Sequence, residues 1–282
     1  MGVDMSIVSF DKPLGDYIEI VLARALDERI RRQKVASGGA TTALLIYMLD
    51  SGEIDGVVAA KKVRGLVAEL VIARNREEVL QAAGNRWSVL PYTTKLKEAL
   101  QHGDVEKVAL VGLPCQAQFL WQMRMFPLLE TDFVNKIHMI ISLFCIGTFV
   151  SEAFVDILKL RYGLDPERVS SIGLEGNRLR IVYDSEEKVI PLQEVIPYIQ
   201  TGCLVCPDYT GVLADLSSGL SENYPGYTVF IIRSECAREA VYGAKDRGYL
   251  EVRKAGADVI DEIETKARGK IVRATRYMSL LL

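Results

Sequence analysis

Strand-like and helix-like segments alternate through the first 160 residues of this 282-residue chain. Apolar runs at 54–62, 66–74, 105–113 and 136–145 have the composition of buried strands. The segments at 40–50, 77–84, 93–100, 117–125 and 151–162 have helical spacing. This alternation predicts the α/β class, with a largely parallel sheet flanked by helices.

The pattern changes after Gly163, where short apolar runs are separated by turn residues at 175–177 and 184–185. This spacing predicts a small antiparallel β insert. A cysteine-rich loop at 201–209 then precedes a strand, a helix, a strand and a last helix. We therefore divide the chain into an α/β core at 1–163, the insert at 164–200, and a segment at 201–282 that completes the core. The cysteine loop is expected to cover the carboxyl edge of the sheet.

Composition excludes several classes of protein. The net charge of -3 argues against a nucleic-acid-binding protein, because phosphate binding requires an excess of basic residues. No apolar run approaches the roughly 20 residues that span a bilayer, so we expect no transmembrane segment and a cytoplasmic location. The five cysteines are an odd number in a long chain, which is unlike a secreted disulfide framework.

Four cysteines have positions that suggest a shared site. Cys115 and Cys145 each follow an apolar run, and Cys203 and Cys206 form a Cys-x-x-Cys pair before a proline. If the two runs are parallel neighbours, both single cysteines emerge at the same carboxyl edge, where the loop can join them. Four thiolates suit zinc or an iron–sulfur cluster. Single cysteines at strand ends favour a cluster, and zinc in a non-redox interaction module or unmetallated thiols remain alternatives.

The other cysteine and the two histidines give weaker signals. Cys236 is predicted to be a small, half-buried helix side chain. His138 lies in an apolar run and is interpreted as a core histidine, and His102 is isolated. No Ser-His or Cys-His arrangement supports nucleophilic catalysis, so no catalytic residue is assigned.

Three glycine-containing loops are candidate cofactor contacts. Ser37, Gly38 and Gly39 precede a helix, and backbone N–H groups at such a start bind phosphate, although an ordinary helix cap explains them too. The loop at 84–88 and the loop at 214–219 are equally ambiguous. In the latter, Asp215 and Ser217 could bond ribityl or ribose hydroxyls or cap a turn. Neither G-x-G-x-x-G nor a Walker loop occurs.

Together these motifs resemble one family. The segments GGATTALL, GNRWSV, GLPCQ, LFC, CLVCPDY and ADLSSG occur in this order across nearly the whole chain. They resemble the beta subunit of coenzyme F420-reducing hydrogenase and the beta subunits of F420-dependent dehydrogenases and formate dehydrogenases. The cysteine pattern, with its flanking Pro114, Phe144 and Asp208, carries most of this resemblance.

The resemblance implies FAD, one [4Fe–4S] cluster and reversible hydride exchange with coenzyme F420. A flavin can join this two-electron transfer to the one-electron chemistry of a cluster. The implied cluster ligands are Cys115, Cys145, Cys203 and Cys206. The implied flavin contacts are Ser37, Gly38, Gly39, Thr41, Thr42, Gly84, Asn85, Arg86, Ser88, Gly112, Pro114, Asp208, Asp215 and Ser217.

Two departures bear on the partners. The second loop has Arg86-Trp87 where the family pattern has a Lys-Tyr pair. The chain also has no ferredoxin-like segment with cysteines of its own, as several members of the family have. We therefore expect electron exchange with iron–sulfur-containing hydrogenase or dehydrogenase subunits. A subunit that uses NAD(P)H or another donor is the alternative.

Overall fold

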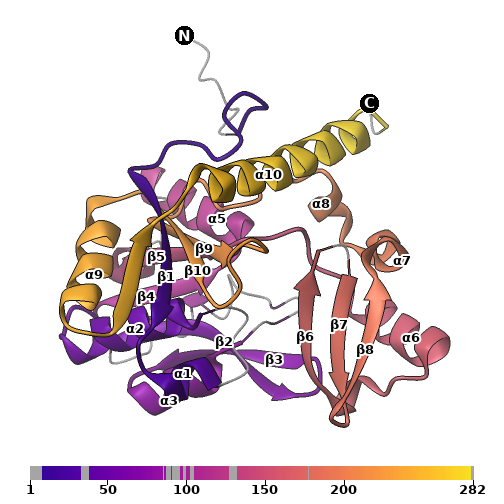
Figure 1. Cartoon of the computed structure of the whole chain (residues 1–282), viewed down its shortest axis with the longest axis horizontal. Helices are drawn as coiled ribbons and strands as arrows, with labels where there is room; N and C mark the ends of the chain where they lie inside the picture. Colours follow the sequence, from indigo (N-terminus) through magenta and orange to yellow (C-terminus); the bar gives the residue numbers. More distant parts are fainter. Residues whose placement is uncertain are drawn as a thin grey trace.

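The computed structural model describes residues 8–32, 38–84, 86, 90, 96–97, 100–101, 105–126, 132–176 and 178–280. Within these residues, a large sheet of eight strands lies beside a small sheet of three, and helix α10 runs along both (Figure 1). The strand order of the large sheet is β11-β1-β10-β9-β5-β4-β2-β3. Its strands are β1 (Glu19–Ala25), β2 (Gly56–Arg64), β3 (Val67–Ala73), β4 (Val108–Gly112), β5 (Ile137–Leu143), β9 (Leu216–Leu220), β10 (Thr228–Ile232) and β11 (Leu250–Lys254).

Helices cover both faces of the large sheet. One face packs against α2, α3 and α9, and the other packs against α5 and α10. Side chains along β10 alternate between the two faces of the sheet. Phe230 and Ile232 pack on the face covered by α2, α3 and α9, and Val229 and Ile231 pack on the face covered by α10. The helices are α1 (Glu28–Arg32), α2 (Ala40–Asp50), α3 (Arg76–Ala82), α5 (Pro114–Met125), α6 (Ser151–Tyr162), α7 (Leu192–Val195), α8 (Thr201–Leu204), α9 (Glu235–Asp246) and α10 (Ala257–Met278).

The predicted α/β class and flanking helices are confirmed. The parallel pairing lies in the centre of the sheet, where β2, β4, β5 and β9 are parallel neighbours. The outer strands pair antiparallel, as short connections such as the turn between β2 and β3 require. Two strands were not expected. β1 contains a short apolar run at 20–23 that was not identified as a strand. The segment at 216–220, interpreted as irregular, forms β9 with buried Ser217 and Ser218.

The predicted antiparallel insert is also confirmed. It consists of β6 (Val169–Glu175), β7 (Arg178–Tyr183) and β8 (Glu186–Pro191). Asp184 and Ser185 have positive φ angles of 47° and 71° in the turn between β7 and β8. This sheet shares a hydrophobic cluster with α6 and with Phe149, Val195 and Ile199. The domain boundaries at 163 and 200 stay a prediction.

None of the described helices has the length and apolar character required to cross a bilayer.

Candidate functional site

A cavity of about 570 Å³ lies between the carboxyl edge of the large sheet, the small sheet and α10. Its walls include the start of α2, the ends of β5 and β9, and the residues that follow α3. From α10 it receives the cationic side chains of Lys266, Lys270 and Arg273. A cavity of this size is within the range of about 300–1,000 Å³ that small molecules and cofactors occupy.

The start of α2 presents backbone N–H groups to this cavity. Gly39 is the N-cap residue, with a left-handed φ of 71°, and no side chain caps the helix. A Cβ atom there would lie 2.7 Å from Cγ2 of Ile30, and one at Gly38 would lie 2.5 Å from the carbonyl oxygen of Gly226. Because Gly39, Thr41 and Thr42 line the cavity, this wall suits an anionic group.

Phe144 and Gly219 form another wall of the cavity. A Cβ atom on Gly219 would lie 1.9 Å from Cδ2 of Phe144, so only glycine allows the ring to occupy this place. The Phe144 ring also contacts the Tyr209 ring, with 5.2 Å between centroids. The neighbouring Ser218 hydroxyl forms a hydrogen bond of 2.7 Å with the Thr41 hydroxyl, which ties β9 to α2.

The sheet brings Cys115 and Cys145 to the same edge. Strands β4 and β5 are parallel, with Gly112 opposite Ser142, and each cysteine follows the end of its strand. Cys115 lies in the first turn of α5, which begins earlier than expected because Pro114 is a favourable first helix residue. The Cys145 amide donates to the Tyr209 carbonyl at 2.8 Å, which ties β5 to the loop that follows Cys203 and Cys206.

The four thiols are electrostatic neighbours. Burial raises the pKa of Cys115, and the charges of Cys206 and Cys203 raise it further. Burial also raises the pKa of Cys145 to about 11, with Lys270 acting in the opposite direction and Cys203 and Cys115 in the same direction. The charges of these cysteines, which are distant in the sequence, therefore act on one another. Their role as a shared ligand set stays a prediction.

The separation of these sulfurs bears on the kind of centre that they suit. Among the described residues, no three of the four sulfurs lie within 4.8 Å of one another. A single tetrahedral zinc ion with Zn–S bonds of about 2.3 Å would place them about 3.8 Å apart. The described arrangement therefore does not have the spacing of four ligands on one zinc ion.

Two cationic side chains of α10 join the cysteine-bearing segments. The Lys270 ammonium, which is 6% exposed, donates to the carbonyls of Cys145 and Asp208, each at 2.6 Å. The Arg273 guanidinium donates to the carbonyls of Ile146 at 2.5 Å and Cys203 at 3.2 Å. Each side chain therefore bridges the end of β5 and the cysteine loop.

Replacing Lys270 with Met should destabilise the chain. The change removes two charged hydrogen bonds and leaves buried carbonyls without these donors, so we expect the free energy of unfolding to fall by about 2–4 kcal/mol. Urea unfolding measures this change. Arg276→Met, at an exposed position of the same helix, is the control and should change stability by less than about 0.5 kcal/mol. Equal stability of the two variants would contradict the bridging role of Lys270.

Three predicted flavin contacts, Asp208, Asp215 and Ser217, have hydrogen-bond partners within the protein. The Asp208 carboxylate accepts from the amides of Thr210, Gly211 and Val212 at 3.1, 2.7 and 3.1 Å. The Asp215 carboxylate accepts from the Ile140 amide at 2.8 Å. The Ser217 hydroxyl accepts from Nε of Arg233 at 2.8 Å.

None of these three side chains lines the cavity. They hold the cysteine loop, β9 and β5 in place. Burial lowers the pKa of Arg233 to about 10, and this side chain also donates to the carbonyls of Leu14 and Asp16 and to Thr210.

The other predicted contacts divide into three groups. Gly39, Thr41, Thr42, Gly84 and Arg86 line the cavity. Gly38, Gly112 and Pro114 do not line it, although Val111 and Leu113 beside them do. Ser37, Asn85 and Ser88, like His102, lie outside the described residues.

Sequence reasoning missed the contribution of α10. The buried residues of this helix include Val259, Ile263, Ala267, Ile271 and Ala274, which form one helical face. Lys270 is buried with them. A lysine on an otherwise apolar face is the signal that could have identified it, because a buried ammonium requires polar partners.

Two adjoining family models match most of the chain. The model described as "Coenzyme F420 hydrogenase/dehydrogenase, beta subunit N-term" matches residues 20–97, and the C-terminus model of the same subunit matches residues 105–258. Among curated proteins, the coenzyme F420 hydrogenase subunit beta of Methanococcus voltae is 32% identical, over 92% of this chain and 94% of that protein. The protein of the same name from Methanosarcina barkeri is 31% identical, over 90% of this chain and 89% of its own.

A solved structure agrees with these matches. A chain of the F420-reducing [NiFe] hydrogenase complex from Methanosarcina barkeri superposes with a TM-score of 0.87 and 28% identity. The alignment covers 94% of this chain and 92% of that one. With the two family models spanning both halves of the sequence, the chain belongs to the coenzyme F420 hydrogenase/dehydrogenase beta subunit family.

Proposed function

We propose that this chain is an F420-dependent oxidoreductase subunit that exchanges hydride with coenzyme F420 at FAD bound in the cavity. Electrons then pass, one at a time, through a [4Fe–4S] cluster held by Cys115, Cys145, Cys203 and Cys206. The acceptors or donors are other subunits of a hydrogenase or dehydrogenase complex. The family membership supports the link to F420, and the geometry of the site supports the arrangement of the two cofactors.

The position of Cys145 carries this proposal. Cys145 belongs to the group of four neighbouring thiols and also lines the cavity. A group bound in the cavity would therefore lie directly beside a centre held by the cysteines. Electron transfer requires two cofactors to lie close together, whereas a purely structural metal site does not require a ligand cavity beside it.

The donor set suits an iron–sulfur cluster. Four thiolates are the usual ligands of a [4Fe–4S] cluster, and among the described residues no three of these sulfurs lie within the 4.8 Å expected for ligands of one ion. The amide and the hydroxyl of Thr148 both contact the Cys203 sulfur at 3.4 Å. Hydrogen bonds of this kind adjust the potential of a cluster.

The cavity suits a flavin nucleotide. We propose that Gly39, Thr41 and Thr42 bind its phosphates, since uncapped N–H groups at a helix start bind anions. Arg273 lines this cavity, and its buried Nε atom has no hydrogen-bond partner among the described residues. An anionic or carbonyl group of a ligand would supply one. FAD, when bound, provides the chemistry that links two-electron and one-electron transfer.

Several residues around the cavity position its walls. Asp208, Asp215 and Ser217 hold the cysteine loop, β5 and β9 in place, and Phe144 with Gly219 shapes the wall. Hydride transfer requires stacking and orientation of two rings, so no side chain is assigned as an acid or base. Gly84 and Arg86 are proposed as further contacts, and Ser37, Asn85 and Ser88 remain predictions.

A rapid-mixing experiment tests the hydride partner. The anaerobic, flavin-loaded chain is mixed with reduced F420 and, separately, with NADH, and the absorbance of oxidised flavin is followed. We expect bleaching by reduced F420 at a rate at least about 100-fold above that with NADH, which corresponds to roughly 2.7 kcal/mol of discrimination. A faster reaction with NADH would contradict the assignment of F420 and favour the nicotinamide alternative.

A further inference from the structure

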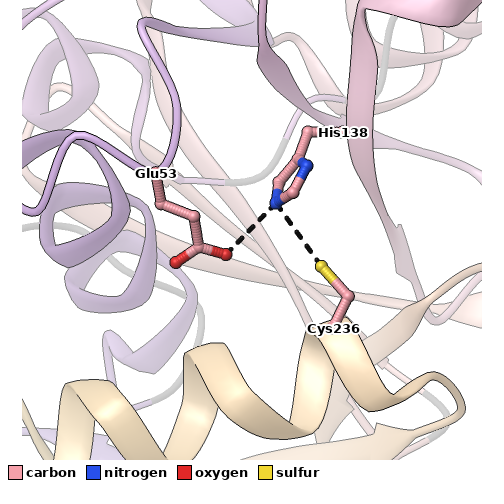
Figure 2. A group of neighbouring side chains, drawn as sticks. All are labelled: Glu53, His138 and Cys236. Atoms are coloured by element: carbon pink, nitrogen blue, oxygen red, sulfur yellow. Dashed lines mark hydrogen bonds and ion pairs between the residues drawn. The ribbon is translucent and has the colours of Figure 1, made fainter.

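A second group of potential metal ligands lies at the opposite end of β5. Figure 2 shows Glu53, His138 and Cys236 pointing toward one another from three separate elements. Glu53 follows α2, His138 is at the start of β5, and Cys236 is in the first turn of α9. These ligand atoms all lie within 4.8 Å of one another.

Both partners approach the same nitrogen of His138. Its Nε2 atom lies 3.3 Å from Oε1 of Glu53 and 3.5 Å from Sγ of Cys236. A proton relay from thiol to carboxylate would require the partners on opposite ring nitrogens, as in a catalytic triad. A neutral imidazole carries one proton or one lone pair at Nε2, so it cannot serve both partners fully.

The same distances are those between ligands of one metal ion. Tetrahedral zinc with the usual Zn–N, Zn–O and Zn–S bonds places nitrogen about 3.4 Å from oxygen and about 3.6 Å from sulfur. The observed 3.3 and 3.5 Å match both separations. In the four-cysteine group, in contrast, no three of the described sulfurs lie within 4.8 Å of one another.

We propose that Glu53, His138 and Cys236 form a zinc site, with water as the fourth ligand. The side chains of His138 and Glu53 are 28% and 27% exposed, so solvent can reach the open position. A thiolate, an imidazole and a carboxylate are the three ligand types that zinc uses in proteins.

The surrounding charges favour a cation. The carboxylates of Glu53, Asp215 and Glu239 act on Cys236, and the guanidinium of Arg124 acts in the opposite direction. Asp215 is held by the Ile140 amide, and Arg124 donates to the Ile137 carbonyl, so both stay close without being ligands. The net charge of these groups is negative even while the Cys236 thiol keeps its proton.

The proposed site joins three separate elements of the fold. His138 and Cys145 are seven residues apart along an extended segment, which places the site about 23 Å from the cluster ligands. Glu53 and His138 are 85 residues apart in the sequence, and His138 and Cys236 are 98 residues apart. A bound ion would therefore fasten the turn after α2 and the start of α9 to the central sheet.

Metal analysis with X-ray absorption tests this site. The full chain is loaded anaerobically with iron and FAD, given one equivalent of zinc sulfate, and dialysed. We expect about one zinc per chain, with one sulfur at about 2.3 Å and nitrogen or oxygen ligands at about 2.0–2.1 Å. Absence of zinc, or zinc surrounded only by sulfur, would overturn the proposal.

Variants separate this site from the cluster. Cys236→Ser and His138→Gln should each lower zinc affinity at least about 100-fold, because even outer partners of a zinc site contribute 10–100-fold. Iron and flavin contents should stay unchanged. Glu239→Gln is the control for nearby charge and should retain zinc. Cys203→Ser should lose iron and keep zinc. Full zinc binding by both Cys236→Ser and His138→Gln would refute the assignment even if one of them folded poorly.

Thermal unfolding provides an independent reading. Free zinc at 100 times its dissociation constant should raise the melting temperature of the wild-type chain by roughly 5 °C. Cys236→Ser should show no such increase. A wild-type melting temperature unaffected by zinc would also count against the site.

Discussion

Cys203→Ser should lose most of the iron from the anaerobically prepared chain, from about four atoms to fewer than about one. A serine hydroxyl is a poor replacement for a thiolate on iron, and Thr148, which contacts the Cys203 sulfur, would then contact a weaker ligand. Electron delivery to a one-electron acceptor dye should fall at least about 100-fold, equivalent to roughly 2.7 kcal/mol in the barrier. Reduction of the flavin by reduced F420 should remain within about twofold of the wild-type rate, because hydride transfer precedes the cluster.

The pattern of losses makes this prediction specific. Cys206→Ser should behave in the same way as Cys203→Ser. Cys236→Ser, at a cysteine far from the cavity, should keep both iron and electron delivery. Loss of iron from Cys236→Ser, or full iron content in Cys203→Ser and Cys206→Ser, would show that the cluster ligands were wrongly chosen.

Gly219→Ala should weaken flavin binding and destabilise the fold. The added methyl group would lie 1.9 Å from the Phe144 ring, so the ring must turn or β9 must shift. Overpacking of this kind costs about 1–3 kcal/mol of stability. Because both residues line the cavity, we expect the flavin dissociation constant to rise at least about 100-fold. Fluorescence titration with FAD measures the affinity, and urea unfolding measures the stability.

Two further variants isolate the clash. Gly173→Ala places a methyl group in open space on β6 and should change stability by less than about 0.5 kcal/mol. Phe144→Leu, combined with Gly219→Ala, should recover part of the stability that the single change loses. Wild-type flavin affinity in Gly219→Ala would show that this wall does not contact the ligand.

The sequence predicted the structure best where a chemically distinctive residue stands at the end of a strand, at the start of a helix or in a turn. Cys115 and Cys145 follow apolar runs that form parallel neighbours, so their common edge could be predicted. Gly39 precedes a helix with clear spacing, and its left-handed conformation explains why glycine stands there. The turn at 184–185 likewise marked the small antiparallel sheet.

Other features depend on contacts that local patterns do not contain. β9 has small polar residues because Ser217 and Ser218 bond to Arg233 and Thr41, which lie far away in the sequence. For Asp215 the sequence left open a bond to a ligand hydroxyl or a turn cap, and its hydrogen bond from the Ile140 amide of β5 could not be foreseen.

The histidine and cysteine outside the main site illustrate the same limit. His138 was interpreted as a core histidine and Cys236 as a half-buried helix side chain, because their separation of 98 residues hides their contact. Only the packing of α9 against the sheet brings them together. Contacts between residues on distant elements could therefore not be predicted from the sequence and become visible only in the structure.

Iron anomalous scattering from crystals grown without oxygen would test the central claim most directly. We predict an iron peak surrounded by Cys115, Cys145, Cys203 and Cys206, with flavin density in the adjoining cavity beside Phe144. Iron bound elsewhere, or a flavin outside this cavity, would contradict the proposed path of electrons through the chain.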